Sequence, residues 1–119
     1  FYQHDGTFRP VECAKINTWY SEMHAYLLAA MSAVDMGGHT LLDESVVFFG
    51  SELSHPPDHT KENMPFLLAG GGLKGGRVLT HANIPHNNLL VAIANMFGDT
   101  RTTFGKADYC QNPITGLTA

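Results

Sequence analysis

The chain has 119 residues, of which 44% are hydrophobic and 15% are charged, a balance typical of a folded globular protein. This length suits one domain with one core. Its 7 basic residues are outnumbered by 11 acidic ones and are scattered singly, so no concentrated positive surface for nucleic acid is expected. The longest apolar runs fall far short of the roughly 20 residues that a membrane-spanning helix needs, so no membrane span is expected either.

A long amphipathic helix is predicted from about Val11 to Asp35. Apolar residues recur there at spacings of three and four, as they do on one face of a helix. They are Ile16, Trp19, Tyr20, Met23, Tyr26, Leu27, Ala30, Met31 and Val34. Pro10 fits the start of this helix, and Gly37 and Gly38 predict a left-handed C-terminal cap that ends it.

Two strands are predicted after this helix, with a polar loop between them. Ser45 to Gly50 is a continuous β-branched and aromatic run of the type that is buried on both faces of a parallel sheet. Met64 to Ala69 is the second apolar run, and it ends in a row of glycines. Helix alternating with strand predicts an α/β fold that contains part of a largely parallel sheet flanked by helices.

The remainder of the chain adds few elements to this sheet. Leu73 to Gly76 predicts a tight turn into a short strand, Arg77 to Leu79. A second helix is predicted to be capped by His86 or Asn87 and closed by Gly98, with loop and tail after it. A sheet with so few strands would have exposed edges. We therefore expect residues 1–119 to be a single segment of a larger domain. The remainder of a longer chain, or other subunits, would then be its partner.

The loop from Ser51 to Asn63 is the predicted place for chemistry, because ligands bind beyond the carboxyl ends of strands in open parallel sheets. It contains oxygen and nitrogen donors suited to a divalent metal such as zinc, manganese or calcium. These donors are Glu52, His55, Asp58, His59 and Glu62. The alternative is an exposed loop that its charged residues merely keep solvated. No phosphate-binding glycine motif or nucleophile elbow occurs, and no organic cofactor is expected.

Other candidate groups have weaker claims. His4 precedes Asp5, and a carboxylate can orient a ligand imidazole. Cys13 and Cys110 lack the short spacing of a zinc or redox pair, which favours two packed thiols and leaves open whether they pair. The remaining histidines suit helix, turn or surface positions better than a site; they are His24, His39, His81 and His86.

Several segments together resemble a known family. They are Gly38 to Glu52, His59, Asn63 to Gly71 and Pro85 to Leu90, with His4-Asp5-Gly6, Ile16 to Trp19 and Tyr26 to Leu28 nearer the start. They are similar to the C-terminal part of a secreted bacterial family of unknown function within the alkaline phosphatase and sulfatase superfamily. Its members are several times longer and often carry a twin-arginine export signal. The resemblance therefore implies a periplasmic or secreted protein and the C-terminal portion of a larger alkaline-phosphatase-like domain.

The resemblance also implies an activity, namely metal-dependent hydrolysis of phosphate or sulfate esters, which are small anionic substrates. In the superfamily, one strand end presents an Asp-His metal pair, and a histidine soon afterwards completes the second metal shell. Here Glu52 and His59 match those places best and are the first candidate ligands, with His4 and His55 as further ones. Leu53 stands where the superfamily has a histidine, and the nucleophile would lie upstream. The alternative is a non-catalytic secreted binding or structural protein that retains the scaffold.

Overall fold

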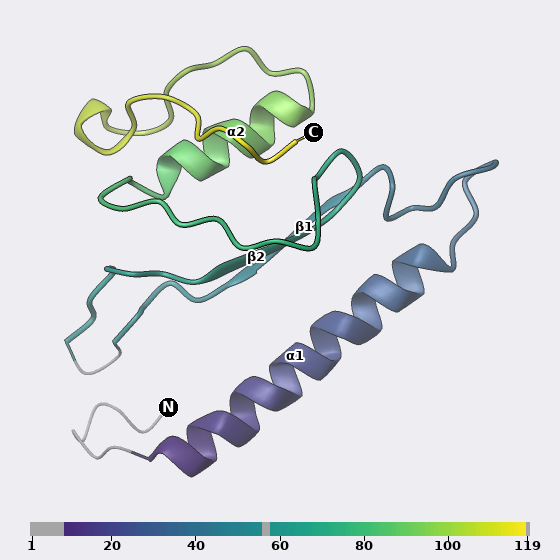
Figure 1. Ribbon diagram of the computed structural model, residues 1–119, viewed down its shortest axis with the longest axis horizontal. Coiled ribbons are helices and arrows are strands. Elements are labelled where there is room, and N and C mark those ends of the chain that lie inside the picture. Colours follow the sequence, from purple (N-terminus) through teal and green to yellow (C-terminus); the bar gives the residue numbers. More distant parts are fainter. Residues whose placement is uncertain (1–8, 56–57, 119) are drawn as a thin grey trace. The chain divides into compact units, whose positions relative to one another are not determined.

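The computed structural model describes residues 9–55 and 58–118. The chain divides into two compact units, Phe1–Gly71 and Gly72–Ala119 (Figure 1). Unit 1 contains helix α1 (Pro10–Ser32) and strands β1 (Val46–Gly50) and β2 (Phe66–Gly70), and unit 2 contains helix α2 (Asn87–Met96) and the 3-10 helix η2 (Ala107–Tyr109). In the part of the chain that the structure describes, no helix is long and apolar enough to cross a membrane.

The first predicted helix is confirmed, although it ends at Ser32 rather than at Asp35. Pro10 takes the first helical position, where its missing N–H is not needed. The predicted glycine cap is wrong. The N–H groups of Gly37 and Gly38 donate to the Asp35 carboxylate, at 2.8 and 3.1 Å, and form a turn beyond the helix. Both glycines do have the expected left-handed backbone, with φ of 94° at each, but they form this turn and not the helix cap.

The predicted parallel sheet is wrong, because the two strands form a two-stranded antiparallel pair (Figure 1). Val46 pairs with Gly70 and Gly50 pairs with Phe66. The physical reason is the connection. Parallel neighbours need a crossover, which is usually helical, whereas the described residues between β1 and β2 contain no helix. The strands are also not buried on both faces, since Phe48 and Leu67 are 42% and 51% exposed.

One face of the β1–β2 pair contacts α1 through a histidine. The ring of His24 stacks on the ring of Phe49, with 4.8 Å between the centroids. His24 is the one buried residue of α1, and its Nε2 atom has no hydrogen-bond partner among the described residues. Removing such an atom from water costs desolvation free energy, and no hydrogen bond offsets that cost. His24 thus acts in this interface as a packing group, not as a hydrogen-bonding one.

His24→Leu should therefore be neutral or stabilising, raising the free energy of unfolding of unit 1 by about 1 kcal/mol, because a buried unsatisfied polar atom is exchanged for an apolar group of similar size. Urea denaturation followed by the fluorescence of Trp19, the only tryptophan, measures this change. His39→Leu is the control, since the exposed His39 ring hydrogen-bonds Glu44 and should gain nothing. A clear loss of stability in His24→Leu would contradict the packing role.

Most of the apolar face predicted for the first helix is exposed on α1. Trp19, Met23, Tyr26 and Leu27 follow one another at helical spacing, and they are 53%, 43%, 73% and 46% exposed. We call these four residues the α1 stripe. The one buried residue of α1 is His24, and Ile16 and Met31 of the predicted apolar set are half-buried, so the apolar pattern and the packing of this helix coincide only in part.

Two glycines let the end of β2 lie directly against the turn that precedes β1. The N–H of Gly71 donates to the carbonyl oxygens of Leu42 and Ser45, at 2.9 and 3.0 Å. A Cβ atom on Gly71 would lie 1.5 Å from the carbonyl oxygen of Asp43, and one on Gly70 would lie 1.9 Å from that of Ser45. No side chain fits at either place.

In unit 2, the predicted second helix and its glycine stop are confirmed. Gly98 has φ of 85° and donates its N–H to Asn95, while Asp99 donates to Ala94, which is the Schellman pattern that ends many helices. His86 precedes the helix, but it makes no side-chain cap. The short strand predicted at Arg77 to Leu79 is wrong.

Arg77 instead ties unit 2 together. Its guanidinium donates to the carbonyl oxygens of Lys74, Gly116 and Leu117. The N–H of Lys74 also donates to Leu117, at 2.8 Å. Val78 is 91% exposed, as a connecting segment allows and a packed strand would not.

Residues of the predicted tail complete the core of unit 2. Cys110 and Leu117 are buried, as are three apolar residues of α2. Asn88, which is also buried, accepts the N–H of Gln111 on its side-chain oxygen at 3.1 Å. Its carbonyl oxygen accepts the N–H of Ile114 at 3.2 Å. One helical residue therefore holds the returning chain at two points.

Candidate functional site

The predicted site loop, Ser51 to Asn63, lies in the connection between β1 and β2. Part of it is a small hairpin. The N–H of Ser54 donates to the carbonyl oxygen of Thr60 at 2.9 Å, and the N–H of Thr60 donates to that of His55 at 3.3 Å. The hydroxyls of Ser54 and Thr60 lie 3.0 Å apart and are partly buried. We call this arrangement the Ser54–Thr60 clasp; it fixes the backbone on both sides of the loop tip.

His55 and Asp58 form a hydrogen-bonded pair beside the clasp. Nδ1 of His55 lies 2.9 Å from Oδ2 of Asp58, and the two side chains are 60% and 68% exposed. Within the described residues, Nε2 of His55 has no hydrogen bond. A carboxylate can only accept a hydrogen bond, so the proton between the two groups belongs to Nδ1 of the ring. The pair leaves the other ring nitrogen available to solvent or to a ligand.

Two of the other predicted ligands, Glu52 and His59, lie at exposed positions. His59 has a left-handed backbone with φ of 52°, which is uncommon outside glycine. His4 lies outside the described residues. No three His, Cys, Asp or Glu side chains come together as a metal-binding group anywhere in residues 9–55 and 58–118. Glu52, His55 and His59 therefore do not form a three-ligand set there.

Three aspartates outside the loop have a lowered pKa, each because of local hydrogen bonds. The backbone N–H groups of Gly37 and Gly38 lower the pKa of Asp35. The backbone N–H and the hydroxyl of Thr40 lower the pKa of Asp43, and the backbone N–H of Arg101 lowers the pKa of Asp99. Such a group stabilises the fold at neutral pH, and this contribution is lost as the pH falls through the lowered pKa, in the acid range below about 4. These carboxylates shape turns, which is a structural role.

Sequence reasoning gave Asp58 a minor part, yet the structure makes it the direct partner of His55. The spacing of three residues across Pro56 and Pro57 is the signal that was available, since adjacent prolines favour a turn and exclude a helix. The same reasoning also passed over the pairing of His39 with Glu44.

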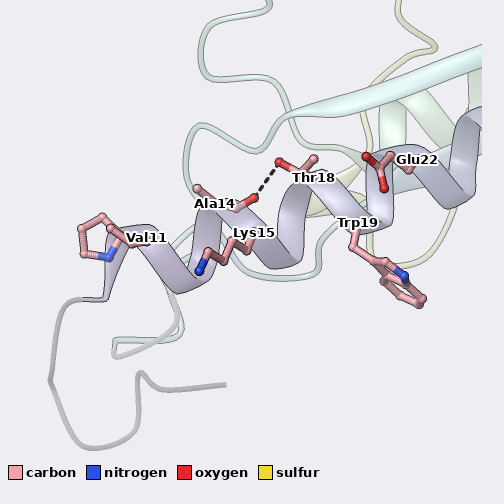
Figure 2. A pocket seen from close by; sticks show the side chains of 7 residues that line it. Val11, Ala14, Lys15, Thr18, Trp19 and Glu22 are labelled. Carbon is pink, nitrogen blue, oxygen red and sulfur yellow. Dashed lines mark hydrogen bonds between the residues drawn. The ribbon is translucent and has the colours of Figure 1, made fainter.

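A shallow hollow on the first half of α1 is unrelated to this loop. Its lining residues all come from one helix, and they are Pro10, Val11, Ala14, Lys15, Thr18, Trp19 and Glu22 (Figure 2). The hydroxyl of Thr18 is used within the helix, since it donates to the carbonyl oxygen of Ala14 at 2.8 Å. With a single helix as its wall, the hollow offers a ligand little enclosure.

No protein-family model, curated protein or solved structure matches this sequence. The resemblance to the alkaline phosphatase superfamily therefore stays a prediction. So do the roles of Glu52 and His59 as metal ligands.

Proposed function

We propose that this chain supplies one wall of the active site of a secreted or periplasmic metal-dependent hydrolase of phosphate or sulfate esters. The observation that carries the proposal is the His55–Asp58 pair, an imidazole oriented by a carboxylate on a clasped loop. Glu52 and His59 are further donors of the same loop. The resemblance of Gly38 to Glu52 and of Asn63 to Gly71 supplies the reaction class.

The described residues fit a metal centre only in part. They offer oriented imidazole and carboxylate donors of the type that borderline divalent ions accept, but no complete set. We therefore assign this loop a contributing role, with the nucleophile and the remaining ligands supplied from outside these residues. A metal in such a site polarises the ester and activates its attacker. Within this chain, His55 would be a ligand, with Glu52 and His59 as further candidate donors of the same loop.

Elemental analysis of the protein in its full natural length tests the proposal. We expect zinc, manganese or calcium close to one equivalent per site, and anomalous scattering from that metal beside the loop. Glu52→Gln, His55→Ala and His59→Ala should each weaken metal binding by about tenfold or more, because each removes a donor. His81→Ala is the matched control, since it removes an exposed histidine outside the loop.

Hydrolysis of 4-nitrophenyl phosphate and 4-nitrophenyl sulfate provides the activity readout. The metal-loaded protein should release 4-nitrophenol from at least one of them, and a chelator should stop the reaction. The proposal is ruled out if the wild type and the three loop variants all lack bound metal and all fail to hydrolyse either ester.

A second candidate function is a non-catalytic binding or structural role, and the exposed α1 stripe favours it. Contiguous apolar side chains on a surface commonly mark a contact with another polypeptide. The same measurements separate the two candidates, because this role predicts neither metal nor ester hydrolysis.

A further inference from the structure

We propose that Asp58 is a positioning residue that holds His55 as the Nδ1–H tautomer and so presents Nε2 as an electron-pair donor. The use of that donor for a divalent cation rests on the proposed function; the tautomer itself does not. The relevant geometry is the 2.9 Å contact between Nδ1 of His55 and Oδ2 of Asp58.

The hydrogen-bond chemistry of the pair fixes the assignment. At neutral pH the carboxylate has lone pairs and no proton, so the imidazole has to donate. A neutral ring has one N–H, and using it on Nδ1 leaves the lone pair on Nε2. A carboxylate behind a histidine is also the arrangement that orients metal-bound imidazoles and raises their basicity.

The clasp gives the pair a defined backbone. The N–H of Ser54 donates to the carbonyl oxygen of Thr60, the N–H of Thr60 donates to that of His55, and the hydroxyls of Ser54 and Thr60 are in contact. Both side chains of the pair are more than half exposed, and an exposed polar pair is weak when both side chains are free to move. The clasp restricts the backbone on both sides of the tip, so less conformational entropy is lost when the His55–Asp58 pair forms.

His39 provides an internal comparison within unit 1. Its ring contacts the Glu44 carboxylate through Nε2 rather than through Nδ1. By the same reasoning, neutral His39 carries its proton on Nε2. The two exposed histidines are therefore expected to be opposite tautomers in one protein.

Long-range proton–nitrogen NMR of the ¹⁵N-labelled protein, at a pH where neutral imidazole predominates, tests this assignment. We expect the Nδ1–H pattern for His55 and the Nε2–H pattern for His39. Asp58→Ala should return His55 to the Nε2–H form that free imidazole side chains prefer. Asp58→Asn keeps an accepting oxygen and should retain part of the Nδ1–H population, while Glu44→Gln should leave His55 unchanged.

Titration with Zn²⁺ alone then separates the tautomer from its use. Zinc should shift the Nε2 resonance of His55, and Asp58→Ala should require about tenfold or more zinc for the same shift. A wild-type His55 that carries its proton on Nε2 would overturn the inference. An Nδ1–H His55 that zinc leaves unshifted, in a protein whose elemental analysis finds no metal, would uphold the inference and count against the proposed hydrolase.

Discussion

Gly71→Ala should lower the free energy of unfolding of unit 1 by about 3 kcal/mol or more. The added Cβ would lie 1.5 Å from the carbonyl oxygen of Asp43, which is backbone and cannot move aside as a flexible side chain can. Relieving that overlap requires separating the end of β2 from the turn before β1, with loss of the hydrogen bonds from Gly71 to Leu42 and Ser45. Urea denaturation followed by Trp19 fluorescence measures the change.

Gly75→Ala is the matched control for this substitution. A Cβ at Gly75 would meet no atom within 4 Å, and its backbone is not left-handed, so the expected change is within about 0.5 kcal/mol. Equal stability of the Gly71→Ala and Gly75→Ala proteins would show that β2 does not approach the turn as described.

Asn88→Ala should destabilise unit 2 by about 2 kcal/mol. The buried side chain of Asn88 accepts the N–H of Gln111, and its removal leaves that donor without a partner beside a small void. The substitution should also loosen the segment that contains the buried Cys110. Amide hydrogen exchange of α2 and of residues 110–117 measures both effects.

Asn87→Ala is the comparison, since the two asparagines are neighbours in α2 with different surroundings. Asn87 donates to the carbonyl oxygen of Phe104 at an exposed position, where water replaces a lost bond. Its substitution should cost less than about 1 kcal/mol. If Asn87→Ala destabilised the protein more than Asn88→Ala does, Asn88 would not hold the returning chain.

The helices could be predicted because their signals are local. Pro10 at the start of α1 and Gly98 after α2 act within a turn of the helix, and both were recognised in the sequence. The glycines after α1 were misread because the Asp35 carboxylate takes their N–H groups. That competition depends on where one side chain points, and the glycine pattern alone does not encode it.

Strand direction was the largest error, and its cause is physical. An apolar run such as Val46 to Gly50 has the same composition in a parallel sheet as in a hairpin, so periodicity does not distinguish the two. The connection does distinguish them, because the segment between β1 and β2 contains two adjacent prolines and no helical pattern. The strand-end argument that first pointed to the site loop was therefore unsound, although the loop does contain an ordered donor pair.

Within the candidate site, residue types were predictable and their grouping was not. Glu52, His55 and His59 were singled out as donors, but the pairing of His55 with Asp58 depends on backbone geometry that residue types do not specify. In unit 2, the segment after Gly98 was expected to be tail because it lacks periodicity. The buried residues of this segment are instead isolated ones, Cys110 and Leu117, which no repeating pattern predicts.

The buried apolar side chains of the described residues all belong to unit 2, whereas the His55–Asp58 pair belongs to unit 1. Local opening free energies follow packing, so slow amide exchange should concentrate in α2 while β1, β2 and their connecting loop exchange quickly. A ligand at that loop would then bind a clasped tip whose supporting strand pair opens often. Part of the ligand's intrinsic affinity would offset the conformational entropy that the β1–β2 pair loses when the ligand binds. Slower amide exchange in the β1–β2 pair would then indicate a bound ligand.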